Sequence, residues 1–366
     1  MKRPALYAGI GILIVALLLI PAAQLNPAEA QAKDLRGTKT DDGVVGYDRL
    51  VAAGISPGVL KPFVILVDNV AAPALPTAVR EIGATRGVMG AAAPPTWRKG
   101  NAALIEAFPD VDGSAKSVRG TISRLKNDVL PVLPDLPGVS SSSPDARFNL
   151  GGTAPEERDF VHAVYGKFPY VLGFVILLTL VLLMRAFRSV VLPIKAVILN
   201  LISLGAAFGI IVLIFQMGHG AEAIWHVHPT NAIISWIPLM IFAFLYGLSM
   251  DYEVFMLTRM REAYDETGDT NTAISLGLAR TGKLVTSAAL VLMFAFFVLS
   301  TSPGTDVKQF GIGLAAGIIF DATVIRALLV PSIMSLIGRW NWWLPSPLAK
   351  VLMVRPRPRP ALEQSG

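Results

Sequence analysis

The 366-residue sequence contains no cysteine and only four histidines. Without cysteine, disulfide bonds and thiolate metal sites are excluded. His219, His226 and His228 share one short segment, while His162 lies elsewhere. That segment could hold a metal ion by chance, but a solvated loop is the simpler interpretation. We therefore predict no metal and no cofactor.

Charged residues are also few, at 16% of the chain against about 25% in a typical soluble protein. The deficit is concentrated in long apolar runs, whereas residues 25–168 have an ordinary soluble composition. The net charge of +6 includes no basic stripe interleaved with aromatic residues, so we expect no nucleic-acid partner. Two parts in different solvents, a membrane and water, are the simplest interpretation.

Six apolar runs are long enough to cross a bilayer, which takes about 20 residues of helix. Helices in a soluble core would be shorter and would show a polar face. The second run is short and may be extended by the helix before it. The predicted spans are Ala5–Ala23, Pro169–Met184, Ala196–Met217, Ala232–Leu257, Leu284–Ser302 and Gln309–Gly338.

The first run allows a second interpretation. Lys2 and Arg3 before it, and Ala28-Glu29-Ala30 after it, also fit a signal peptide with a cleavage site. Cleavage would leave five spans and the same polar domain outside. We favour an uncleaved helix, because an even number of spans agrees better with a basic tail on the same side as the N-terminus.

The basic residues indicate the orientation of the spans. The loops 218–231 and 303–308 contain a single basic residue, Lys308, whereas the segments on the other side are rich in them. Those segments hold Lys2, Arg3, Arg185, Arg188, Lys195, Arg259, Arg261, Arg280, Lys283, Arg339, Lys350, Arg355, Arg357 and Arg359. Since basic segments stay in the cytoplasm, both termini are predicted to be cytoplasmic.

The predicted organisation follows from these spans. Residues 1–24 are the first membrane helix, and residues 25–168 are an extracytoplasmic domain. Residues 169–338 are a five-helix bundle, in which 259–283 is an amphipathic cytoplasmic connector resting on the membrane surface. Residues 339–366 are a basic, Pro-rich cytoplasmic tail.

The polar domain shows the pattern strand, helix, strand, strand, helix, strand. The predicted strands are Pro62–Asp68, Gly87–Ala92, Ala102–Phe108 and Arg147–Leu150, and the helices are Ala74–Ala84 and Ser114–Leu130. This order is that of the split βαβ, ferredoxin-like α+β fold. Ser140–Ser143 is predicted to be a flexible loop. A further helix is expected to begin near Thr153 and to continue towards the second span.

Three ionisable residues lie at or inside the spans, where each costs about 2.5–3.5 kcal/mol to insert and persists mainly where it has a function. Asp251 follows the run Ile233–Met250, and Asp321 and Arg326 interrupt the sixth span. Asp251 could also simply mark the cytoplasmic end of its helix, with Glu253 just outside. Tyr252 supplies a hydroxyl that could hydrogen-bond a neighbouring carboxylate.

Asp321 and Arg326 could form an ion pair with each other. However, a separation of five residues places them about 140° apart around an α-helix. We therefore expect a partner on another helix, and Asp251 facing Arg326 or Asp321 is the most economical arrangement. The proton occupancy of such a carboxylate would respond to its surroundings, as a proton relay requires.

Several motifs in order resemble one family. They are Gly151-Gly-Thr with Asp159-Phe, Gly247-Leu-Ser-Met-Asp-Tyr-Glu-Val-Phe, Arg259-Met-Arg-Glu, Thr281-Gly-Lys, Asp321-Ala-Thr-Val-Ile-Arg and Val330-Pro-Ser. Together they are similar to the MMPL (mycobacterial membrane protein, large) branch of the RND transporter superfamily. The resemblance implies export of lipids or other hydrophobic compounds across the inner (plasma) membrane, driven by the proton-motive force. It also implies porter-like extracytoplasmic domains and a proton relay of Asp251, Tyr252, Asp321 and Arg326.

Members of that family have twelve spans in two similar halves, and this sequence resembles the C-terminal half only. The Asp-Tyr pair of the first half is absent. The chain is therefore expected to dimerise or to pair with a separately encoded first half, unless it is a truncated product without activity of its own. Its other expected partners are membrane lipids, protons and a hydrophobic cargo.

Other functions are weaker interpretations. A protein-export accessory subunit can also have six spans, and a non-transporting scaffold could recruit envelope-synthesis enzymes through the outer domain. ATP is not expected to drive transport, because the sequence has no Gly-x-x-x-x-Gly-Lys-Ser/Thr motif. We do not expect an enzyme, because the outer domain shows no convincing nucleophile–base or metal constellation.

Overall fold

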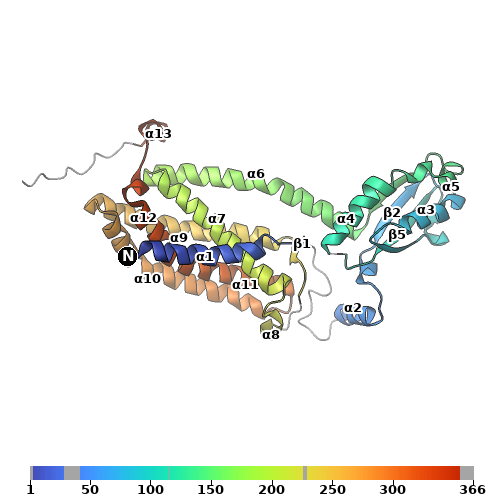
Figure 1. The fold of residues 1–366 in the computed structure, drawn as a ribbon, viewed down its shortest axis with the longest axis horizontal. Coiled ribbons are helices and arrows are strands. Elements are labelled where there is room, and N and C mark those ends of the chain that lie inside the picture. The colour runs from blue at the N-terminus through green and yellow to red at the C-terminus, as the bar shows by residue number, and fades with distance from the viewer. Residues whose placement is uncertain (1–2, 29–41, 114, 226–228, 355–366) are drawn as a thin grey trace, which may run out of the picture. The chain divides into compact units, whose positions relative to one another are not determined.

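The computed structural model describes residues 3–28, 42–113, 115–225 and 229–354 (Figure 1). It divides into two compact units. The helix-bundle unit contains the chain up to Leu25, Phe168–Pro229 and the chain from Trp236 onward, and the polar unit contains Asn26–Lys167 with Thr230–Ser235. Some predictions fall wholly or partly outside the described residues: those on Lys2, Ala28-Glu29-Ala30, the helix start at Ser114, His226, His228 and the arginines from Arg355 onward.

Six helical stretches in the described chain are long and apolar enough to cross a membrane, as the sequence predicts. Two of them contain π-helical segments, Val212–Gln216 after α7 and Asp321–Leu329 between α11 and α12. The helices of these stretches are α1 (Pro4–Ala22), α6 (Thr153–Phe187), α7 (Val191–Ile211), α9 (Ile237–Thr267), α10 (Thr270–Val298), α11 (Thr305–Phe320) and α12 (Val330–Ile337).

Two boundaries differ from the prediction. The fourth span begins at Ile237 instead of Ala232, because Ile233–Ile234 form a strand, β7, that pairs in parallel with β1 (Pro27–Ala28). Residues 259–283 are not a separate connector helix: α9 continues to Thr267, and α10 begins at Thr270. Gly268 makes the sharp turn between them with φ of 67°, a conformation that favours glycine.

The basic segments meet at one end of the bundle. The α6–α7 connection binds the segment after α12, since the Ser189 hydroxyl donates to the Asn341 carbonyl at 2.6 Å. Near the end of α9, the Arg261 guanidinium donates to the Phe187 carbonyl at 3.2 Å. These contacts join three segments that the positive-inside rule assigns to one side.

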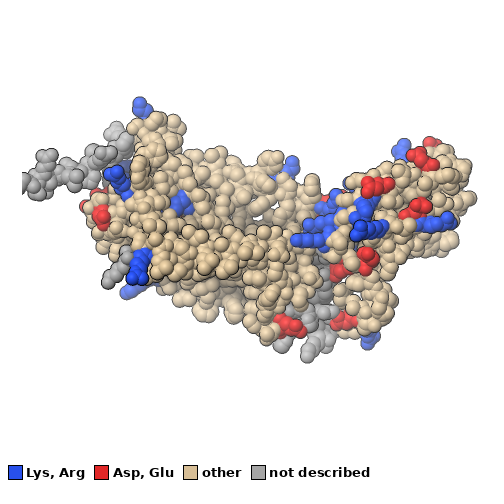
Figure 2. All heavy atoms as spheres, in the orientation of Figure 1, with Lys and Arg blue, Asp and Glu red and all other residues tan. Residues whose placement is uncertain are grey.

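Small residues allow the membrane helices to pack closely. A side chain at Gly209 of α7 would overlap the backbone oxygen of Leu18 in α1, and one at Gly317 of α11 would press on Leu245 of α9. The first of these contacts is with the backbone of the neighbouring helix and the second with a side chain, and such close packing at small residues is typical of helices within a membrane. The same bundle surface is almost uncharged over the face seen in Figure 2, where most Lys, Arg, Asp and Glu side chains lie on the polar unit.

The polar unit is built on a sheet in the order β3-β5-β2-β6. All neighbouring strands in it are antiparallel, and a short strand, β4 (Arg98–Lys99), also pairs with β5. The strands are β2 (Phe63–Asp68), β3 (Val88–Ala92), β5 (Ala102–Pro109) and β6 (Arg147–Gly151). With α3 (Leu75–Gly83) after β2 and α4 (Lys116–Arg124) after β5, the element order is the one that the sequence predicts.

The core of the polar unit lies between one face of this sheet and the two helices. Phe63, Ile65 and Val67 alternate along β2 and are fully buried, because side chains two residues apart share a face of a strand. Ile82 of α3 and Ile122 of α4 belong to the same core cluster. The strand and the two helices that supply this core are among the elements that the sequence predicts.

The shorter elements complete the description. The helical turn α5 (Pro137–Ser140) ends at the first residue of the predicted loop Ser140–Ser143. Ser143, at the end of that loop, is buried and accepts a hydrogen bond from Ala71 N at 2.7 Å. The remaining helices are α2 (Asp42–Ala52), α8 (Ala221–Trp225) and α13 (Ser346–Val351). Single 3₁₀ turns lie at Pro57–Leu60, Ala72–Ala74, Pro95–Trp97, Leu133–Asp135, Leu299–Thr301 and Gly338–Trp342.

Candidate functional site

Asp321 and Arg326 form a buried ion pair within one helix. Arg326 Nη2 lies 2.6 Å from Asp321 Oδ2, and both side chains are more than nine-tenths buried. The expectation that five residues of separation keeps them apart is wrong, because the segment is not an α-helix. In its π-helical winding, with the Val330 N–H donating to the Ile325 carbonyl five residues back, residues five apart lie on the same side.

A proline next to this segment provides a reason for the wider turn. Pro331 lies in the first turn of α12. Proline has no N–H to donate, and its ring clashes with the carbonyl four residues earlier, so an α-helix cannot pass through it unchanged. Local π-helical adjustment satisfies the freed backbone groups of membrane helices.

Ser249 of α9 joins the ion pair to a second helix. Arg326 Nη2 donates to the Ser249 carbonyl at 2.6 Å and lies 3.0 Å from its hydroxyl. The same hydroxyl lies 2.9 Å from Asp321 Oδ2. The pair is thus fixed to α9 through both the backbone and the side chain of one serine.

Two more ionisable residues are buried nearby. Asn200 of α7 contacts the Ser249 hydroxyl through Oδ1, and its Nδ2 donates to Glu253 Oε2 at 3.2 Å. Lys195, five residues before Asn200, is 6% exposed, and Glu253 is 4% exposed. Three atoms of these charged groups have no hydrogen-bond partner in the described part of the chain: Lys195 Nζ, Glu253 Oε1 and Asp321 Oδ1.

The other two predicted site residues are Asp251 and Tyr252, and only Tyr252 lies beside the ion pair. Asp251 is exposed on α9 and does not face Arg326 or Asp321 as expected. It does not mark a helix end either, because α9 continues for sixteen residues to Thr267. The ring of Tyr252 lies against the Arg326 guanidinium, with 5.3 Å between ring centroid and Cζ. Three of the four predicted residues are therefore together, and Asp251 is apart from them.

The predicted site residues do not include Lys195, Asn200, Ser249 and Glu253. Lys195 was assigned to a loop and Glu253 to the solvent beyond a helix end, whereas both are in the bundle. One signal was available: Ser249 and Glu253 are four residues apart, which places them on the same face of a helix. Asn200 is likewise a polar residue within a long apolar run.

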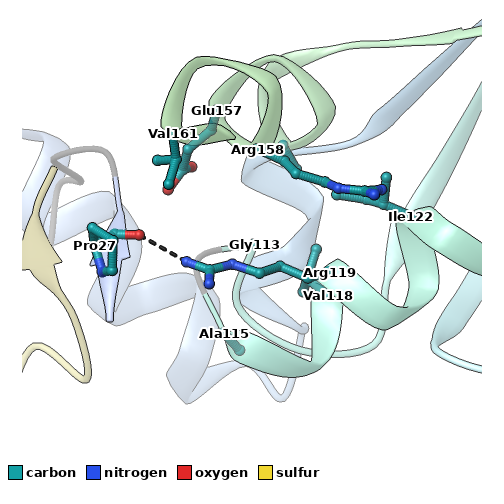
Figure 3. Close-up of a pocket in the computed structure, with 10 residues that line it drawn as sticks. Pro27, Gly113, Ala115, Val118, Arg119, Ile122, Glu157, Arg158 and Val161 are labelled. Atoms are coloured by element: carbon teal, nitrogen blue, oxygen red, sulfur yellow. Dashed lines mark hydrogen bonds between the residues drawn. The ribbon is translucent and has the colours of Figure 1, made fainter. Parts of the chain in front are cut away.

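The described part of the chain also contains two cavities. In the helix bundle, an open apolar cavity of about 570 Å³ is walled by α1, α7 and the residues around α12, with the Lys195 stem in its wall. In the polar unit, a pocket of about 20 Å³ lies beside Arg119, which reaches the Pro27 carbonyl (Figure 3). The second has room for about one water molecule. Among the described residues, no three His, Asp or Glu side chains are grouped to hold a metal ion.

Comparison with known proteins identifies the class. The model of the MMPL family matches residues 126–360, and the chain belongs to that family. Together with its six apolar helices, this makes it a multi-pass membrane protein of the MMPL class.

Particular relatives match nearly the whole chain. It is 32% identical to the "Mycolic acid-containing lipids exporter MmpL11" of Mycolicibacterium smegmatis, over 96% of this chain and 36% of the relative. It is 31% identical to the "Trehalose monomycolate exporter MmpL3" of Mycobacterium tuberculosis, over 94% of this chain and 36% of the relative. The "Heme uptake protein MmpL11" of the same species is 34% identical, over 82% and 31%. The chain spans about a third of the length of these relatives, whose names are those of transporters.

Proposed function

We propose that this chain is one half of an exporter that moves lipids or other hydrophobic compounds outward across the inner membrane as protons move inward. Asp251, Tyr252, Asp321 and Arg326 form its proton relay. The polar unit is an extracytoplasmic, ferredoxin-like porter domain, and both termini are cytoplasmic.

The observation that carries this proposal is the Asp321–Arg326 pair inside the bundle. Its groups lie 2.6 Å apart and buried, yet Asp321 Oδ1 has no hydrogen-bond partner in the described part of the chain. An ionisable group in a membrane helix is costly and is typical of proton and ion pathways. A carboxylate with one free oxygen can accept a proton without losing its fixed partners.

The position of Asp251 supports the role of a second half. Met240, Phe244, Gly247, Asp251 and Phe255 are exposed at helical spacing along one face of α9. Asp251 lies fourteen residues after Ile237, about 21 Å along the helix axis. A carboxylate at that depth faces protein or a water-filled cavity in a membrane, and not lipid. A second six-helix half would cover this stripe and give Asp251 a partner.

The energy source and the cargo are mutually consistent. One charge crossing the membrane supplies about 2.3 kcal/mol per 100 mV, which corresponds to roughly one and a half decades of cargo gradient. Two relatives are named for mycolic-acid lipids and one for heme, and all of these compounds are hydrophobic. The apolar cavity beside α1 and α7 provides a surface for an acyl chain.

Proteoliposomes with a pH-sensitive dye inside test this function. We expect trehalose monomycolate, added with an imposed proton gradient, to accelerate proton uptake by the wild-type chain, with heme as a second probe. Asp321→Asn should remove the acceleration, whereas Glu262→Gln, in the exposed pair with Arg259, should keep it. Equal uptake by Asp321→Asn and wild type would refute the relay.

The absence of native cysteine allows a clean test of the second half. A spin label on Gly247→Cys, next to Asp251 and with open space around it, should be shielded from lipid-dissolved oxygen in the assembled transporter. A label on Val291→Cys of α10, which is 68% exposed, is the matched control. Equal accessibility of the two labels would contradict a partner on the α9 face.

A further inference from the structure

Two buried carboxyl groups in the bundle are connected by a continuous chain of hydrogen bonds. Asp321 Oδ2 lies 2.9 Å from the Ser249 hydroxyl, which also contacts Asn200 Oδ1. Asn200 Nδ2 in turn donates to Glu253 Oε2 at 3.2 Å. The chain passes through three elements, the π-helical segment, α9 and α7, and Asp321, Ser249, Asn200 and Glu253 are all buried.

The number of protons available along this chain of hydrogen bonds makes its bonding pattern depend on the protonation of Asp321. The Ser249 hydroxyl has one proton, but two acceptors, Asp321 Oδ2 and Asn200 Oδ1, lie within hydrogen-bond distance. It can therefore donate to only one of them at a time. When Asp321 is ionised, it competes for that proton; when Asp321 is protonated, it can itself donate, and the Ser249 proton is free for Asn200. The state of Asp321 thus changes the hydrogen bonding of the amide that holds Glu253.

The surroundings of Glu253 leave one of its oxygens available. The charged groups that act on it electrostatically are Lys195 from α7 and Arg326 and Asp321 from the π-helical segment. Tyr246, on its own helix, bonds Thr179 of α6 through its hydroxyl. Glu253 Oε1 and Lys195 Nζ each have no hydrogen-bond partner among the described residues. By contrast, Glu157 of the polar unit binds Lys61 directly at 2.8 Å.

The chain of hydrogen bonds runs from Asp321 towards the basic end of the bundle. Glu253 lies four residues beyond Ser249, towards the end of α9 that carries Arg259 and Arg261. Lys195 lies five residues before Asn200, towards the start of α7, at the same basic end of the bundle. Glu253 is therefore between Asp321 and that end.

We propose that Glu253 is a second proton-binding carboxyl group of the bundle, linked to Asp321 through Ser249 and Asn200, with Lys195 as its counter-ion. Its use in transport rests on the proposed proton-driven function, but its proton binding does not. Each group takes up one proton from the medium and releases it again, and the linkage makes the occupancy of one depend on the other. Interacting groups of this kind titrate as a pair.

Infrared difference spectroscopy of the full chain in lipid nanodiscs tests proton binding without transport. Across a pH titration, we expect two carbonyl-stretch bands from protonated buried carboxyl groups. Glutamate labelled with ¹³C at its side-chain carboxyl should shift one of these bands and leave the other, which requires no substitution. Glu253→Gln should remove the shifted band and Asp321→Asn the other, whereas Glu157→Gln, which alters the other buried glutamate, should remove neither.

The linkage has its own test. In the wild-type background, Glu253→Gln should move the midpoint of the Asp321 band by about one pH unit or more. In an Asn200→Leu background, which keeps the side-chain size but breaks the chain of hydrogen bonds, Glu253→Gln should move that midpoint by less, because only the direct electrostatic interaction between the two carboxyl groups remains. No ¹³C-sensitive buried band in the unsubstituted protein, or an Asp321 midpoint indifferent to Glu253→Gln, would overturn the inference. If both bands titrate but Asp321→Asn keeps full transport, the proposed function fails and this inference stands.

Discussion

Each of the two units buries a pair of oppositely charged side chains, but the pairs have different surroundings. In the polar unit, Lys61 Nζ and Glu157 Oε2 lie 2.8 Å apart as a direct, buried ion pair. In the helix bundle, Asp321 and Arg326 lie 2.6 Å apart and are linked by hydrogen bonds to Ser249, Asn200 and Glu253, and Lys195 acts electrostatically on Glu253.

The difference separates a structural pair from a group that can change state. A buried ion pair such as Lys61–Glu157 can be replaced by apolar residues with little loss of stability, because the attraction between the two charges mainly offsets the cost of their desolvation. In the bundle, Asp321 and Glu253 each have an oxygen without a hydrogen-bond partner among the residues that the structure describes, and a buried atom of this kind is costly. We interpret that cost as a requirement of function.

The largest effect is expected from breaking the bundle pair. Arg326→Met leaves Asp321 as an unpaired buried charge and should cost about 3–5 kcal/mol in detergent unfolding experiments. The double variant Asp321→Asn, Arg326→Met should recover most of that stability, because neither charge remains, while proton uptake stays lost. Arg259→Met, in an exposed pair, should cost no more than about 1 kcal/mol. Normal proton uptake by the double variant Asp321→Asn, Arg326→Met would show that the bundle pair, like the pair in the polar unit, is only structural.

Breaking and then replacing the ion pair of the polar unit should change stability but not proton uptake. Lys61→Met should destabilise this unit by about 3–5 kcal/mol, since the buried Glu157 carboxylate loses the cation 2.8 Å away. The variant Lys61→Met, Glu157→Leu should regain stability and also keep wild-type proton uptake. Unfolding of the polar unit measures its stability, and the proteoliposome assay with the pH-sensitive dye measures proton uptake. A stable double variant without uptake would show that this pair also has a functional role.

A smaller effect is expected where the polar unit holds its edge segments. Arg119 Nη2 donates to Asn26 Oδ1 at 3.0 Å and to the Pro27 carbonyl at 2.8 Å, next to β1 (Figure 3). Arg119→Ala should cost about 1.5–3 kcal/mol, because hydrogen bonds from a charged donor are lost. Hydrogen exchange should then be faster at Ile233 and Ser235, whose N–H groups bond the β1 segment. The substitution Arg147→Ala, at an exposed residue, should leave the exchange rate at these two positions unchanged.

The smallest effect concerns the turn between α9 and α10. Asp269 caps α10 by accepting a hydrogen bond from Thr272 N at 2.7 Å, and this bond lowers the pKa of the Asp269 carboxyl below its usual value. A carboxyl with a lowered folded pKa stabilises the fold above its unfolded pKa, and the contribution is lost as the pH falls through the folded pKa. Asp269→Ala should cost about 1 kcal/mol at neutral pH. The cost should vanish below the folded pKa, and an equal cost in strong acid would contradict the cap.

The spans and the polar sheet were predictable because they depend on local patterns. A span needs only enough apolar residues in sequence, and a strand such as Phe63–Asp68 appears as a short apolar run bounded by turn residues. The fourth span was placed too early because Ile233 and Ile234 are apolar for another reason, the pairing with Pro27 and Ala28. That pairing joins residues more than two hundred positions apart, which no local pattern contains.

The site was predictable in composition but not in geometry. Charges in apolar runs identified Asp321 and Arg326, and the spacing argument then separated them because it assumed α-helical winding. Lys195 and Glu253 were assigned to water because they lie close to other charged residues in the sequence. Burial of a side chain depends on which helices surround it, so their place in the bundle was not visible.

The sequence by itself determined that the chain has six apolar spans, a polar α+β unit and a family membership carried by its motifs. Those properties depend on residue types and short spacings, which the chain carries with it. Only the tertiary structure decided that Asp321 and Arg326 meet on one π-helical turn, that Glu253 joins them through Ser249 and Asn200, and that Asp251 lies apart. These facts depend on how separate helices pack and wind, because the distance between two charges is a property of the packed bundle.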